Sequence, residues 1–277
     1  MKCVFNASHF TTVIRKDNEL LAQSVYLSTS IEAIGMVRAD VSSFMINGAE
    51  WEIYRSPDNL LNELADVPEL KGTEAFLNVG QALRDVIGDR GGGLPRELLA
   101  ECIRGLIQAE TFVYQERGYS SPEAYDNYWE ELSADYCRYF TNLDKVEKHW
   151  RDHVGPFERG RSLYNRCKKS EVWVGQDGRI SSGGSFIDSY HELCVQIRID
   201  SRGVIEECQG NFLRAPDRIC FENADNLNIM IGQNLADLSK RQIGGDLGGP
   251  QGCFHLVDLV YDIGQAVNEV FQGMRRG

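Results

Sequence analysis

The feature that most constrains this fold is an internal repeat. Three segments of the chain recur in the same order, at an offset that falls from 160 to 157 residues. Residues 32–40 align with 192–200, residues 55–60 with 214–219, and residues 92–99 with 249–256. One such match could arise by chance, but three in order indicate a tandem duplication with small loop deletions.

Each copy changes its hydrophobic period from strand-like to helix-like. Short runs rich in β-branched and aromatic residues predict strands at 10–14, 20–27, 33–41 and 44–54, and again at 172–174, 186–187, 193–199 and 204–213. Residues 200–203 are typical of a hairpin turn. Apolar stripes from Leu98 to Ile107 and from Leu256 to Phe271 then predict amphipathic helices. We therefore expect an α+β fold: an antiparallel sheet covered by helices, present twice as an internal pseudo-dimer.

The segment between the copies repeats nothing. Ser121 followed by Pro122 predicts a helix start. Aromatic residues follow at helical spacing from Tyr125 to Tyr139, a pattern more typical of core packing than of a cofactor slot. The predicted organisation is a degenerate first copy at 1–114, a helical linker at 115–166, and a second copy at 167–277 that carries the functional site.

Charge and hydropathy narrow the class of protein. The chain has 29 Lys and Arg against 41 Asp and Glu, a net charge of −12, which disfavours nucleic acid as a partner. No run approaches the roughly 20 apolar residues of a membrane span, and residues 1–16 lack the apolar core of a signal peptide. We expect a cytoplasmic protein without a membrane partner, whose eight cysteines are thiols or metal ligands rather than disulfides.

Comparison of the two copies isolates the candidate site. Two thiols and two imidazoles of the second copy, His191, Cys220, Cys253 and His255, stand where the first copy has Ile31, Leu61, Arg96 and Leu98. Cys2His2 is a ligand set for a tetrahedral zinc site or an iron centre. Asp188 is close enough in sequence to orient His191. The second copy is therefore predicted to bind a transition metal, zinc or iron.

The spacing of these residues sets conditions on the site. Cys253 and His255 are two apart, so they converge only if the chain is still extended there, which the glycine-rich residues 248–252 favour. A helix N-terminus at this point would stabilise a Cys253 thiolate. His149 and His153 are four apart on a predicted helix, but their charged neighbours indicate a solvated face. Two alternatives stay open: a metal- or thiol-dependent enzyme of unknown substrate, and a metal-free binding module.

About the second half of the chain resembles a bacterial domain family of unknown function. The resemblance lies in residues 191–200, 216–220 and 252–256, and the family has Gly-Cys-Thr-His-Leu before its last helix. This chain departs at Phe254, where Thr is usual, and at Glu192, where Asp is usual. Neither departure affects the predicted ligands.

More distantly, the same half is similar to NifU-type domains, the scaffolds on which iron–sulfur clusters are assembled. By position, Cys220 matches the central cysteine of the scaffold, His255 its last cysteine and His191 its early aspartate, while its first cysteine falls on Ser189. The resemblance implies a NifU-like fold, metal or cluster handling, and a client metalloprotein as partner. Ser189 cannot serve as a thiolate ligand, which weighs against cluster assembly and leaves metal binding open.

Overall fold

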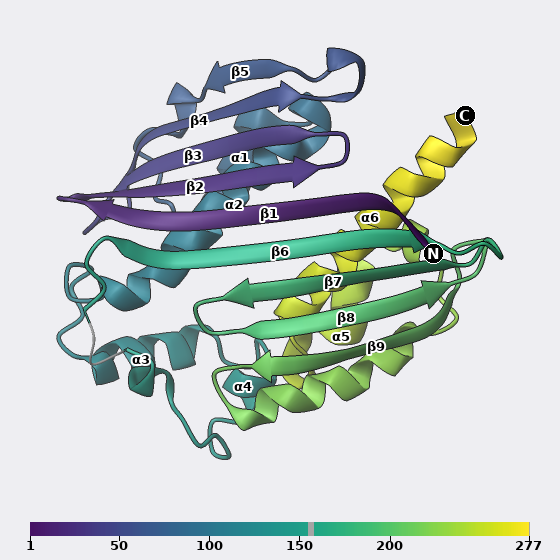
Figure 1. The fold of residues 1–277 in the computed structure, drawn as a ribbon. Coiled ribbons are helices and arrows are strands. Elements are labelled where there is room, and N and C mark those ends of the chain that lie inside the picture. The colour runs from purple at the N-terminus through teal and green to yellow at the C-terminus, as the bar shows by residue number, and fades with distance from the viewer. Residues whose placement is uncertain (155–157, 277) are drawn as a thin grey trace. The chain divides into compact units, whose positions relative to one another are not determined.

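The computed structural model describes residues 1–154 and 158–276, so residues 155–157 of the predicted linker lie outside the described part. Nine strands form one sheet in the order β5-β4-β3-β2-β1-β6-β7-β8-β9 (Figure 1). Their bounds are β1 Lys2–Lys16, β2 Glu19–Ser28, β3 Glu32–Asp40, β4 Ile46–Arg55, β5 Glu63–Asp66, β6 Ser162–Val174, β7 Ile180–Asp188, β8 Glu192–Ile199 and β9 Ile205–Arg214. The pairings of β2 to β5 and of β7 to β9 are antiparallel. The predicted combination of an antiparallel sheet with helices is confirmed.

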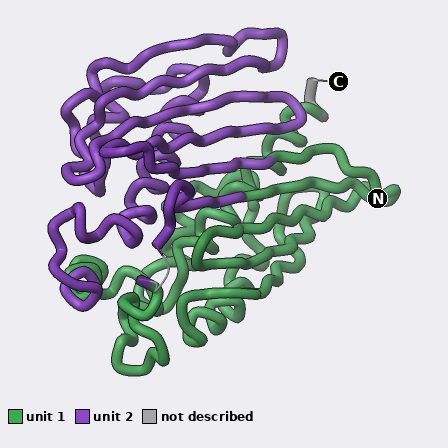
Figure 2. The backbone as a smooth tube through the Cα atoms, turned by 60° about the vertical axis from the view of Figure 1, so that its left-hand side comes forward, with its two compact units in different colours: residues 1–7, 126–153, 168–277 green, residues 8–125, 154–167 purple. Residues whose placement is uncertain are grey.

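The chain divides into two compact units (Figure 2). Unit 1 comprises residues 1–7, 126–153 and 168–277, and unit 2 comprises residues 8–125 and 154–167. All four predicted ligands, and the helical segment 126–153, belong to unit 1.

In unit 2, helix α2 (Leu94–Ala109) lies against β2, β3 and β4, and α1 (Gly80–Ile87) packs beside it (Figure 1). Most of the predicted stripe of α2 is buried, including Leu98, Leu99 and Leu106, while Ile107 at its end is half-buried. Each such leucine stabilises the fold by about 1.5–3 kcal/mol. Helix and strand approach closely at Gly35, where an added Cβ would lie 2.8 Å from the Cβ of Leu98. A larger residue at position 35 would push the helix off the sheet.

In unit 1, helix α6 (Phe254–Arg276) lies against β7, and α5 (Lys240–Leu247) packs on α6. The side chains of β8 alternate as predicted: Leu193, Val195, Ile197 and Ile199 are buried. A long 3₁₀ segment, Arg218–Met230, follows β9 and packs against it. The turn predicted at 200–203 is present, with the amide of Gly203 donating to the carbonyl of Asp200 at 3.1 Å.

Two short helices, α3 (Pro122–Leu132) and α4 (Arg138–Thr141), come from the segment that repeats nothing. Helix α3 begins where predicted, because the hydroxyl of Ser121 accepts a hydrogen bond from the amide of Ala124 at 3.2 Å. The aromatic stripe is only partly core: Tyr125 and Tyr139 are buried, whereas Tyr136 is exposed and stacks on Phe254.

Strand β5 was not predicted, since its residues are mostly exposed and carry no alternating pattern. No helix in the described part of the chain is long and apolar enough to cross a bilayer.

Candidate metal centre

The turn between β7 and β8 is held by Asp188, the last residue of β7. Its Oδ1 accepts hydrogen bonds from the backbone amides of Tyr190 at 2.7 Å and His191 at 2.6 Å. This is the local capping that makes Asp a preferred turn residue. The guanidinium of Arg214, at the end of β9, donates to the carbonyls of Asp188 at 2.7 Å and His191 at 3.2 Å. These bonds fix the direction in which His191 leaves the backbone.

His255 reaches the same place from the first turn of α6. The chain passes tightly before it, because a Cβ on Gly252 would lie 2.1 Å from the carbonyl oxygen of Leu247, so only glycine fits. The amide of Cys253 then donates to that same carbonyl at 2.7 Å. These contacts fix the start of α6. The ring centroids of His255 and His191 are 3.8 Å apart, and the two ring planes form an angle of 33°.

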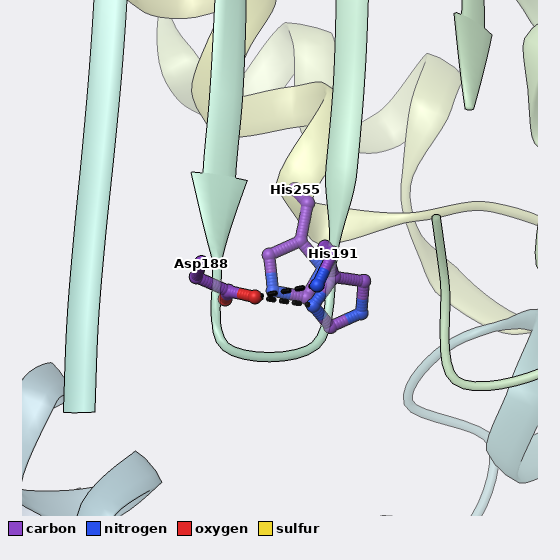
Figure 3. Close-up of side chains that lie close together, drawn as sticks. All are labelled: Asp188, His191 and His255. Carbon is purple, nitrogen blue, oxygen red and sulfur yellow. Dashed lines mark hydrogen bonds and ion pairs between the residues drawn. The ribbon is translucent and has the colours of Figure 1, made fainter. Parts of the chain in front are cut away.

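Three side chains thus converge in unit 1, and we call them the Asp-His-His cluster: Asp188, His191 and His255 (Figure 3). Each offers one ligand atom, and these atoms all lie within 4.8 Å of one another. Oδ1 of Asp188 lies 3.2 Å from Nδ1 of His191. The Asp188 side chain is fully buried and that of His191 is 10% exposed. Phe186 packs edge-on against His255, with 4.9 Å between ring centroids, and forms an apolar wall.

Cys253 lies beside the cluster. Its Sγ is 3.7 Å from Nδ1 of His255, within the range of a weak sulfur hydrogen bond. Burial raises the pKa of the Cys253 thiol to about 12, although the backbone amide of Leu256 at the helix start acts to lower it. The thiolate stabilisation expected from the helix N-terminus is therefore outweighed by desolvation. Without a metal, Cys253 is a protonated thiol at neutral pH.

Cys220 lies in the 3₁₀ segment after β9, and burial raises its pKa to about 12 as well. Among the described residues, neither Cys220 nor Cys253 joins a group of three converging ligand atoms. The structure thus brings together two of the four predicted ligands, His191 and His255, and adds Asp188. It sets Cys253 against His255 and leaves Cys220 outside the cluster. A site with all four side chains stays a prediction.

His149 and His153 do not share a helical face. His149 precedes a short 3₁₀ turn, and its Nδ1 lies 2.9 Å from Oε1 of Glu130. Nε2 of His153 instead lies 3.0 Å from the carbonyl oxygen of Pro216. The two rings therefore have different partners.

Comparison with curated proteins found no matching relative. A scan of family models does match part of unit 1, and the match includes the whole Asp-His-His cluster together with Cys220 and Cys253. The predicted resemblance to a domain family of unknown function is confirmed for this part of the chain, while the similarity to NifU stays a prediction. Residues 176–269 match the family described as "Protein of unknown function (DUF2889)".

Proposed function

We propose that unit 1 binds one divalent transition-metal ion through Asp188, His191 and His255. The observation that carries this proposal is the convergence of two imidazoles and one buried carboxylate, supplied by a strand end, a turn and a helix start. Imidazole suits zinc, iron, copper and nickel, and two histidines with one carboxylate are a known set for zinc and for non-haem iron.

The distances suit coordination. Two ligands that each lie about 2.1 Å from one ion are separated by roughly 3.0–3.4 Å at the angles of tetrahedral or octahedral geometry. Oδ1 of Asp188 and Nδ1 of His191 are 3.2 Å apart. With Nδ1 of His255 facing Cys253, Nε2 is the atom of His255 that coordinates. The sulfur of Cys253 then accepts a hydrogen bond from the Nδ1–H group of His255 and orients the ring, as outer partners of metal-bound histidines do.

The ligand count favours an open centre. Structural zinc sites use four protein ligands, whereas catalytic sites use three and leave a position for water or substrate. We propose that the open position activates a water molecule or a small substrate, which makes the protein a metal-dependent enzyme. A role as an iron–sulfur scaffold is disfavoured, because the Asp-His-His cluster contains no thiolate, whereas proteins hold iron–sulfur clusters mainly through thiolates. A closed site that recruits Cys253 and Cys220 is the competing arrangement.

The internal repeat is part of this proposal. The two copies derive from one duplicated segment, and the Asp-His-His cluster belongs to the second copy, which lies in unit 1. The register of the strands supports the duplication. The β3–β4 pairing shifts between Glu32 and Ala33, and the β8–β9 pairing shifts between Glu192 and Leu193, which are the matching positions in the two copies. A second shift follows at Arg38 and at Arg198. Bulges are features that families retain, so their agreement favours common descent.

Metal analysis of protein purified without a histidine tag tests the proposal. We expect His191→Ala to contain about one equivalent less of zinc or iron than the wild type, because the ligands of one site are incomplete. The matched control is His9→Gln, since His9 is also buried but its Nε2 lies 2.7 Å from the hydroxyl of Ser24 in unit 2. Equal metal content in both variants would refute the assignment.

Cobalt substitution separates the open centre from the closed one. Co²⁺ bound by nitrogen and oxygen gives weak visible bands only, whereas bound thiolate adds an intense charge-transfer band in the near ultraviolet. We expect no such band for the centre made by Asp188, His191 and His255. A band that disappears in Cys253→Ala would instead establish Cys253 as a ligand.

A further inference from the structure

A second group of potential ligands lies in unit 1, apart from the Asp-His-His cluster. Asp126 and Glu130 are four residues apart on helix α3, so they share one helical face. His149 reaches them from the start of the 3₁₀ turn Trp150–Asp152. One ligand atom from each of the three lies within 4.8 Å of the other two, and Nδ1 of His149 is 2.9 Å from Oε1 of Glu130.

The carboxylate of Asp126 is buried without a full set of hydrogen-bond partners. Its side chain is fully buried, and within the described residues its Oδ1 has no hydrogen-bond partner. The other oxygen, Oδ2, lies at the long distance of 3.4 Å from the guanidinium of Arg151. Burial raises the pKa of Asp126, as does the neighbouring charge of Glu130, while the backbone amide and guanidinium of Arg151 oppose the rise. An unsatisfied buried carboxylate oxygen is costly, and a like charge one helical turn away adds to the cost.

A divalent cation would remove both penalties at once. It would coordinate the unsatisfied oxygen of Asp126 and neutralise the two carboxylates, while His149 supplies a nitrogen ligand. The side chains of Glu130 and His149 are 24% and 30% exposed, so water can complete the coordination shell. Two carboxylates with one imidazole form a harder ligand set than the Asp-His-His cluster, which suits manganese as well as iron or zinc.

We propose that Asp126, Glu130 and His149 form a second metal site, selective for hard or borderline divalent cations such as Mn²⁺. The site uses none of the residues of the first centre, so it does not depend on the proposed function. The competing arrangement is a metal-free ion-pair network, in which Arg151 and a protonated His149 balance Asp126 and Glu130.

Titration of the tag-free, full-length protein with Mn²⁺ tests the site, because the electron paramagnetic resonance signal of free Mn²⁺ falls as the ion binds. The titration is made on the wild type and on His255→Ala, which removes the proposed first centre. We expect one Mn²⁺ to bind in both. Asp126→Asn and Glu130→Gln should each weaken that binding about 100-fold or more, since each loses a charged ligand but keeps its size and a hydrogen-bonding oxygen.

His153→Gln is the matched control, because His153 lies in the same segment but outside the group, and it should bind Mn²⁺ as the wild type does. Circular dichroism establishes that each variant is folded. Unchanged Mn²⁺ affinity in folded Glu130→Gln would overturn the proposal. So would a wild type that binds neither Mn²⁺ nor Zn²⁺ at this group with a Kd below about 1 mM. Failure of the first centre alone would appear instead as unchanged Co²⁺ spectra in His255→Ala.

Discussion

The β2–β3 turn of unit 2 and the β7–β8 turn of unit 1 have the same construction. In unit 2, the hydroxyl of Ser28 accepts a hydrogen bond from the amide of Ile31 at 2.9 Å, and Arg55 donates to the carbonyls of both residues. In unit 1, Asp188 and His191 stand in those two positions, and Arg214 donates to their carbonyls. The hydrogen bonds from the arginine to the turn carbonyls, and the side chain that accepts from the turn amide, therefore stabilise the turn in both units.

The difference between the turns lies in three side chains. Where unit 1 has Asp188, His191 and His255, unit 2 has Ser28, Ile31 and Leu98. Leu98 is fully buried in the unit 2 core, on the helix that lies against β2 to β4. The matching turn and helix thus carry mainly apolar side chains in unit 2 and the proposed metal ligands in unit 1. The turn and its arginine contacts are common to both units, while the proposed metal chemistry depends on three side chains that differ between them.

The largest effect is expected when unit 1 is given the unit 2 residues. In a Glu130→Gln background, which removes the second proposed site, the double variant His191→Ile with His255→Leu should weaken zinc binding by at least about 1,000-fold, because both imidazole ligands are gone. The metal-free form should unfold at the same temperature or higher, since buried polar groups are replaced by apolar ones. Isothermal titration calorimetry with Zn²⁺ and thermal denaturation measure the two effects. Retained zinc affinity would show that the difference between the turns has no bearing on metal binding.

An intermediate effect is expected from Asp188→Ser, which introduces the turn residue of unit 2. Serine can accept the same backbone hydrogen bonds, so stability should be preserved, whereas zinc affinity should fall about 10–100-fold. The matched variant Asp188→Ala should lose zinc affinity and also about 1 kcal/mol of unfolding free energy, because the turn bonds disappear. If serine restores zinc binding as well as stability, the carboxylate is structural only.

The smallest effect concerns the buried thiols. Because burial raises the folded-state pKa of Cys220 and Cys253 to about 12 from an ordinary value of 9.0, the unfolded state ionises first as pH rises. Stability from these thiols is therefore complete below about pH 9 and is lost progressively up to about pH 12. Chemical denaturation across this range should show that the unfolding free energy declines less steeply with pH for Cys253→Ala than for the wild type.

A further small effect is expected from Cys220→Ala. Bound zinc should remain in this variant, and release of zinc there would favour the closed four-ligand site.

Much of the secondary structure could be predicted because its signals are local. Alternation in β8, the apolar stripes of α2 and α6, and the Ser121 cap of α3 each depend on neighbouring residues only. The comparison of the copies also selected His191 and His255 as candidates, since polar side chains stood where the first copy has apolar ones, and the structure brings the two rings together. Cys220 met the same criterion, yet it lies outside the cluster because the 3₁₀ segment after β9 determines where its side chain is placed.

The second group was missed for a related reason. Glu130 and His149 are 19 residues apart, and nothing in the spacing of α3 distinguishes Asp126 from a surface acid. Only the fold buries Asp126 and turns His149 toward it.

The sequence by itself determined the periodic elements, the turns and the repeated order of the two copies, because hydrophobic period and turn chemistry act over a few residues. Tertiary structure alone decided which of the candidate side chains meet, which carboxylate is buried and why the two cysteines stay protonated. Convergence and desolvation both depend on groups brought together from distant parts of the chain.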